Sequence, residues 1–207
     1  MGRSKYKVYN GKSLKRIFEN SRLFFLTALF AVGVCVGAAM LKSGEPITEG
    51  ISVLFNTYSS LRTEQGIVRN FCNSFAVNGL FIAINLFFGF SLIGYPFLNV
   101  LPLIKGLGTG AICGYLYSAY KFTGLGYCFL MIFPGAVVSA FALIIACNDS
   151  CEYSRNAYLK AIKGEGQFEK DETRVYLIRQ LVFLGICAAS SGIDAFFNEL
   201  FSGFFKV

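Results

Sequence analysis

A single lysine lies in the most apolar part of this sequence. The stretch from Phe88 to Gly114 is interrupted by Pro96 and Pro102, and Lys105 is its one charged residue. A charge inside a membrane-spanning helix costs about 2.5–3.5 kcal/mol on insertion scales, so an ammonium group here needs a partner that offsets this cost. Such a group can hold two helices together by hydrogen bonds, or it can line a polar path through the membrane.

The partner of Lys105 is suggested by its depth in the membrane. Counted from the preceding turn, Lys105 lies about ten residues along its helix, which corresponds to about 15 Å. Asn85 lies at nearly the same depth on the helix before it, whereas Asp194 lies near the opposite interface. We therefore expect Lys105 to face Asn85 and the free carbonyls near Pro102, rather than Asp194. The alternative is that Lys105 extends to the cytoplasmic interface as an anchor.

Three glycines follow Lys105 at every fourth position: Gly106, Gly110 and Gly114. On a helix they form a smooth groove in which another backbone can approach closely. Packing within the helix bundle is the simpler interpretation, and an interface with another membrane protein or a second copy of the chain is the alternative. Pro102 and Pro134 should disturb their helices, and these kinks either line a cavity or are static packing features.

The sequence gives little support for catalysis or for a bound cofactor. The chain has no histidine, and no serine lies in a nucleophile elbow. The seven cysteines lie mostly inside or at the ends of apolar runs, where they are expected to act as small packing residues rather than as disulfides or zinc ligands. We expect no catalytic, metal-binding or cofactor-binding residue, and a protein that is not an enzyme.

These residues must be positioned by membrane-spanning helices. Hydrophobic residues make up 55% of the 207 residues and charged residues only 15%. Several uncharged runs are long enough for the roughly 20 apolar residues that cross a bilayer as a helix. The sequence predicts an all-α polytopic membrane protein, a single membrane domain over 1–207. Its five spans are expected at about 23–41, 75–94, 97–120, 125–147 and 175–197, with a turn near Lys121.

The distribution of lysine and arginine predicts the orientation. The N-terminal segment carries seven of them and the segment 149–174 carries five, whereas the segments on the other side carry three, one and one. Because basic residues favour the cytoplasmic side, we expect the N-terminus and the loop 148–174 in the cytoplasm, and the loop 42–74 and the C-terminus outside. The basic residues lie beside the apolar runs and form no stripe among aromatics, so nucleic acid is not an expected partner and membrane lipids are.

The external loop contains an amphipathic pattern. Apolar residues recur there at helical spacing, among them Leu54, Phe55 and Tyr58. This pattern predicts a helix that lies on the outer membrane surface or against a partner, and a helix that merely caps the bundle is the alternative.

The central motif resembles that of a known family. Gly89-Phe90-Ser91-Leu92-Ile93-Gly94-Tyr95-Pro96, followed by Lys105-Gly106 and Gly110, is similar to the signature of the stage II sporulation protein M family. The layout of the spans agrees over nearly the whole chain, and Asp194-Ala195-Phe196 stands where relatives usually have glutamate before Ala-Phe. Many relatives carry a histidine and a glutamate after the proline of the fourth span, and neither is present between Gly135 and Phe141 here.

The resemblance implies a scaffold rather than an enzyme. Family members in endospore-forming bacteria are cell-membrane proteins of the engulfment machinery, which anchor two peptidoglycan-degrading partners, stage II sporulation proteins D and P, at the septum. The loop 42–74 and the C-terminal tail would then be contact surfaces outside the membrane, and a homo-oligomer is possible. The alternative function is a permease-like or channel-like subunit that moves a small solute or a lipid, with Lys105 and the proline kinks along its path.

Overall fold

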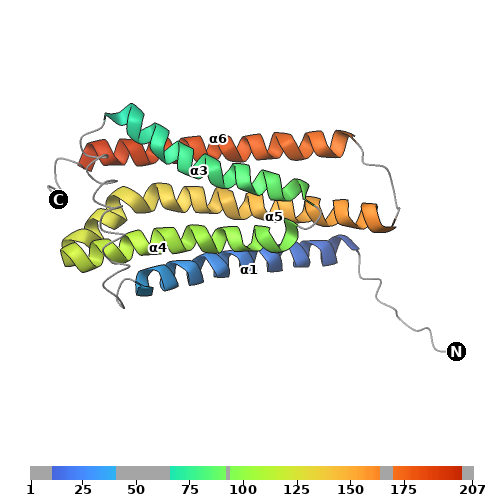
Figure 1. Cartoon of the computed structure of the whole chain (residues 1–207), viewed down its shortest axis with the longest axis horizontal. Coiled ribbons are helices and arrows are strands. Elements are labelled where there is room, and N and C mark those ends of the chain that lie inside the picture. The colour runs from blue at the N-terminus through green and yellow to red at the C-terminus, as the bar shows by residue number, and fades with distance from the viewer. Residues whose placement is uncertain (1–10, 41–65, 92–93, 164–169, 202–207) are drawn as a thin grey trace.

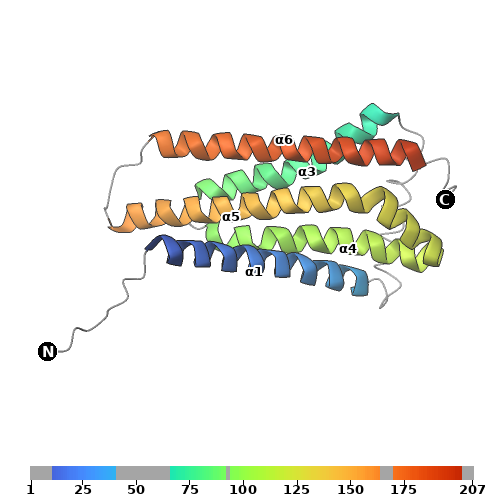
Figure 2. The same cartoon turned by 180° about the vertical axis from the view of Figure 1, so that it is seen from behind.

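The chain folds as a bundle of long helices. The computed structural model describes residues 11–40, 66–91, 94–163 and 170–201. The elements in chain order are α1 (Gly11–Met40), α3 (Ile67–Phe90), α4 (Gly94–Tyr127), the π-helix η1 (Cys128–Ile132), α5 (Phe133–Lys163) and α6 (Lys170–Phe201). The helices run lengthwise beside one another, with α1 and α6 on opposite sides of the bundle and α3 at a slant to the rest (Figure 1, Figure 2).

Five helices are long and apolar enough to cross a membrane. The candidate spans are Ser21–Met40, Ile67–Phe90, Gly94–Ser118, Phe133–Leu159 and Glu172–Leu200. The described residues thus confirm the prediction of an all-α membrane protein with about five spans. The predicted external helix with Leu54, Phe55 and Tyr58 lies outside the described residues.

Each of the five long helices extends beyond the span that the sequence predicts for it, at one end or at both. The second was expected to begin at 75, but α3 begins at Ile67, and α5 continues into the expected loop 148–174 as far as Lys163. A charged residue ends an apolar run without ending a helix, because backbone hydrogen bonds continue past the membrane boundary. Asp149, just after the predicted fourth span, lies on α5 and accepts a hydrogen bond from Arg179 of α6 at 2.7 Å.

The chain reverses direction near Lys121, as expected. Lys121 has φ 51° and ψ −126°, which interrupts the helical geometry within α4. Such a positive φ is uncommon for a residue with a side chain, so this turn is held by its surroundings. The chain then returns through η1 into α5 (Figure 1).

Apolar side chains occupy both the interior and the outer surface. Leu26 and Leu98 are fully buried, and Leu143 is 2% exposed. Phe24 and Phe87 point outward with exposed fractions of 78% and 72%. Outward-facing phenylalanines on long apolar helices are typical of a surface that contacts lipid.

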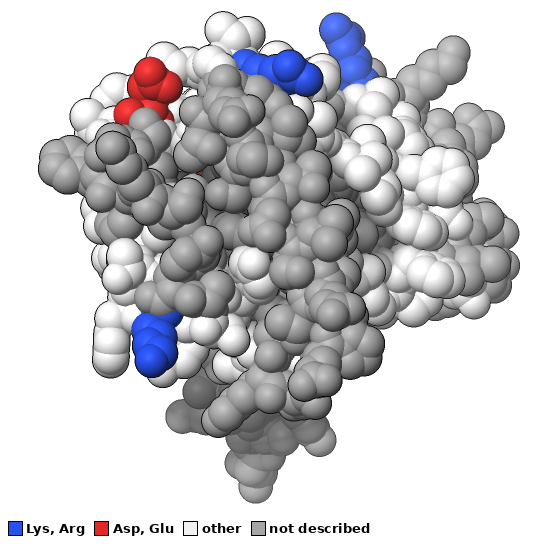
Figure 3. Space-filling view, turned by 60° about the vertical axis from the view of Figure 1, so that its left-hand side comes forward, with Lys and Arg blue, Asp and Glu red and all other residues white. Residues whose placement is uncertain are grey.

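Charged side chains are sparse at the end of the bundle where α3 begins and α6 ends. Figure 3 looks toward this end, and the lysine, arginine, aspartate and glutamate side chains among the described residues lie apart from one another. The basic side chains that are visible on this face among those residues are separate from one another.

Candidate functional site

The glycines of α4 pack against α1. A Cβ atom added at Gly106 or Gly110 would overlap with the carbonyl oxygens of Phe30 and Val34, respectively. The contact is reciprocal, because a Cβ atom at Gly33 of α1 would overlap with the carbonyl oxygen of Leu103. Gly114 and Gly37 extend the same backbone-to-backbone contact. The glycine groove is therefore filled within the bundle, which agrees with the simpler of the two sequence interpretations.

Lys105 is buried and is bound by α3. Only 8% of Lys105 is exposed, and its Nζ donates a hydrogen bond to Oδ1 of Asn78. The ammonium also lies 5.1 Å from the ring centroid of Phe81, within range of a cation–π interaction. The prediction that Lys105 meets Asn85 is thus wrong, as is the alternative that it extends to the interface. Its partner Asn78 lies on the same face of α3, about two helical turns before Asn85 in the chain.

Asn78 passes this connection on to α6. Its Nδ2 donates to Oγ of Ser191 at 3.3 Å, and Ser191 in turn donates to the carbonyl of Cys187 at 2.9 Å. Three helices are joined by this chain of hydrogen bonds from Lys105. All three side chains are buried. The membrane interior has no water to bind these polar groups, so the hydrogen bonds between the helices satisfy them instead.

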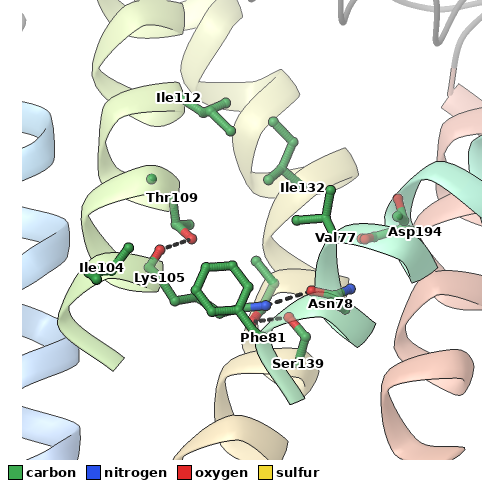
Figure 4. A pocket seen from close by; sticks show the side chains of 13 residues that line it. Val77, Asn78, Phe81, Ile104, Lys105, Thr109, Ile112, Ile132, Ser139 and Asp194 are labelled. Carbon is green, nitrogen blue, oxygen red and sulfur yellow. Dashed lines mark hydrogen bonds between the residues drawn. The ribbon is translucent and has the colours of Figure 1, made fainter. Parts of the chain in front are cut away.

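A cavity of about 190 Å³ adjoins Lys105. It lies among α3, α4 and α5, with Asp194 of α6 at its far wall (Figure 4). Most of its lining is apolar, and its polar members are Ser74, Asn78, Lys105, Thr109, Ser139 and Asp194. The expectation that depth separates Asp194 from Lys105 is wrong, because α6 continues to Phe201 and places Asp194 more than a turn inside its end.

Asn85 belongs to a second polar cluster. Its Nδ2 donates to Ser150 at 2.8 Å and to Gln180 at 3.2 Å, so it joins α3 to α5 and α6. Gln180 donates to Ser150 at 3.1 Å, and the hydroxyls of Ser150 and Tyr176 lie 2.9 Å apart. The Oδ1 atom of Asn85 is buried and has no hydrogen-bond partner among the described residues.

More polar side chains are buried in the bundle than the sequence indicated. Asn70, Ser74, Asn78 and Asn85 are all buried and recur along one face of α3. Their helical spacing in the sequence could have indicated a buried polar face, but the search for spans considered only charged residues. Ser150 lies in the segment 148–174, which was expected to be a cytoplasmic loop, and Gln180 lies near the start of the predicted fifth span.

The prolines have different local roles. Pro96 lies in the first turn of α4, where a helix loses no hydrogen bond to proline, and Pro102 is fully buried inside α4. Pro134 opens α5 directly after the π-helix, so the expected disturbance is a change of helix type. A Cβ atom at the adjacent Gly135 would overlap with the Asp194 carboxylate, and Ser190 donates to the Gly135 carbonyl at 2.7 Å.

Two cysteines are paired, contrary to expectation. Cys113 of α4 and Cys128 of η1 form a disulfide with a Cα–Cα distance of 5.9 Å. The turn at Lys121 brings them together, which the sequence spacing alone did not indicate. Among the described residues, no group of three or more His, Cys, Asp or Glu could hold a metal ion.

The family was identified by comparison with known proteins. The family model described as stage II sporulation protein M matches residues 26–197. The chain belongs to the stage II sporulation protein M family. The match begins in α1 and ends in α6, so it includes three of the candidate spans in full, most of the first and the last, Lys105 and both polar clusters. No curated protein and no solved structure matched the chain.

Proposed function

We propose that this chain is a non-enzymatic scaffold of the bacterial cell membrane, which anchors peptidoglycan-degrading partners at the septum during forespore engulfment. The observation that carries the proposal is membership of the stage II sporulation protein M family, whose model matches residues 26–197. The partners implied by the resemblance are stage II sporulation proteins D and P.

The internal structure supports a holding role. Lys105 and Asn78 join α4 to α3, Asn78 and Ser191 join α3 to α6, and Ser150 joins α5 to both. Buried hydrogen bonds between helices contribute about 0.6 kcal/mol each on average in membranes, and more where one partner is charged. A bundle held in this way would give attached partners a fixed position.

The outward amphipathic segment is the proposed contact for these partners. Replacing Leu54, Phe55 and Tyr58 with serine should abolish co-purification of the two hydrolases from sporulating cells, because the apolar face would be lost. Alanine at Glu49 and Asn56, which the same helical spacing places away from the apolar residues, is the control and should preserve co-purification. Full recovery of the hydrolases with the triple serine variant would contradict a role for this segment.

A second candidate function is a permease-like or channel-like subunit for a small solute or a lipid. It is favoured by the cavity beside Lys105, with Asn78 and Asp194 in its wall. In this case Lys105→Met should abolish transport by proteoliposomes while the protein still inserts. The scaffold proposal expects no transport by the wild-type protein in the same vesicles.

A further inference from the structure

The cavity beside Lys105 opens toward the lipid-facing surface between α3 and α4. Two of its apolar lining residues are also surface residues, since Val77 is 53% exposed and Ile104 is 50% exposed. Gly108 also lines the cavity, and a Cβ atom at this position would meet no atom within 4 Å. A group that moves laterally in the bilayer can therefore reach the cavity.

The two groups that contact the ammonium of Lys105 are neutral, and the carboxylate that lines the same cavity, Asp194, acts on it electrostatically from the far wall. Asn78 supplies an amide oxygen and Phe81 supplies a ring face, whereas an ammonium carries three N–H donors and a full charge. Asp194 lies at the α6 wall against Gly135, and in Figure 4 it lies beyond Asn78 as seen from Lys105. An acceptor that enters from the α4 side would meet Lys105 first.

The shape of the surface suits another helix. A volume of about 190 Å³ accommodates one long side chain or a ring-sized molecule. Gly108 leaves the outer face of α4 flat at this point, and close approach of helices in membranes depends on such small residues. Gly106 and Gly110 do not serve this purpose, because α1 already covers them.

We propose that this groove binds a membrane-spanning helix of a partner, which inserts one carboxylate side chain into the cavity to pair with Lys105. A carboxylate complements the charge of Lys105, and in a low-dielectric environment this attraction exceeds that of a neutral acceptor. The inference rests on the proposed scaffold function, and it gives the scaffold a contact within the membrane in addition to the external segment.

The test uses the full chain in nanodiscs with a host helix as the probe. The host is a single leucine-rich span with glutamate, glutamine or leucine at its midpoint, and association is measured by resonance energy transfer between dyes on the two proteins at neutral pH. The glutamate helix should associate about tenfold or more tightly than the leucine helix, with the glutamine helix between them.

Two variants locate the contact, and a third serves as the control. Gly108→Leu should abolish the preference for glutamate by filling the entrance, and Lys105→Met should do so by removing the charge. Gly185→Leu places the same side chain in open space on the surface of α6 and should keep the preference. If Lys105→Met fails to fold, Gly108→Leu decides the question, since nothing around Gly108 obstructs the new side chain.

Other outcomes would overturn the inference. Equal association of the three host helices with the wild-type protein would do so, and so would an unchanged preference in Gly108→Leu. If oleate, at the same mole fraction as the host helix, displaces the glutamate helix and keeps it away from Lys105, the occupant is a lipid carboxylate instead. The two proposals fail separately. Absence of the hydrolases from preparations of the wild-type chain, with an intact glutamate preference, contradicts the scaffold role, whereas co-purification of the hydrolases without a glutamate preference contradicts this site.

Discussion

At the scale of single residues, the main feature is that a charged side chain is held by an amide rather than by an ion pair. Asn78 accepts from Lys105 and donates to Ser191, so it uses both ends of its amide group. An amide can do this without adding a second charge to the membrane interior. Its removal leaves the donor of Lys105 and the acceptor of Ser191 unsatisfied, and the cost of such groups exceeds that of a lost neutral contact.

This arrangement predicts an asymmetric pair of substitutions. Asn78→Leu should lower the free energy of unfolding by about 2–3 kcal/mol, since it leaves a buried charge without its acceptor. Lys105→Met should cost less, because methionine fills the space and removes the charge. The double variant should be more stable than Asn78→Leu alone. Reversible unfolding in mixed micelles measures all three, and strictly additive effects would contradict the coupling.

The sequence suggested the lysine but not its partner. Asn78 and Asn85 lie on the same face of α3, so periodicity cannot choose between them. The choice depends on the slant of α3 and on where the helix begins, and α3 begins at Ile67 rather than at 75 (Figure 2). Asp194 was misplaced for the same reason, since the end of α6 sets its depth.

At the scale of elements, α4 has two faces with opposite demands on side-chain size. Gly106 and Gly110 face α1, where a Cβ atom would overlap with main-chain oxygens, whereas Gly108 faces open space. The four-residue spacing of the first set was visible in the sequence and predicted a groove. The helix that fills the groove was not predictable, because the spacing of Gly33 and Gly37 marks a face for close contact but does not say which helix it meets.

Alanine substitutions along α4 should separate the two faces. Gly110→Ala should destabilise the protein by about 1–3 kcal/mol, since α1 must move away to make room. Gly108→Ala, the matched control, should be neutral or stabilising by up to about 1 kcal/mol through helix propensity. Thermal unfolding in detergent checks both, and equal effects at the two positions would argue against close packing of α1 on α4.

At the scale of the whole molecule, the number of helices follows from the uncharged runs, but their orientation in the membrane remains a prediction. The N-terminal segment and the segment 149–174 carry most of the lysine and arginine, and the connection between α5 and α6 lies within the latter. A chain with five spans places its two ends on opposite sides of the membrane.

A pair of fusions tests this orientation. Alkaline phosphatase joined after Val207 should be active, because it needs the oxidising exterior, whereas the same enzyme inserted at Gly166 should be inactive. A fluorescent protein that matures only in the cytoplasm should show the opposite pattern. Phosphatase activity at the insertion and none at the C-terminus would mean that the bundle is inverted.

The contact between α1 and α4 also means that α1 is made well before the helix against which it packs. α1 leaves the ribosome first, yet the helix that fits its glycine face is the third span to be made. Until α4 enters the bilayer, Gly33 and Gly37 have no matching backbone, so a chain interrupted before Lys105 exposes a small-residue surface to lipid. Completion of this one helix pair therefore buries the glycine face of α1 only after three of the five candidate spans have been made.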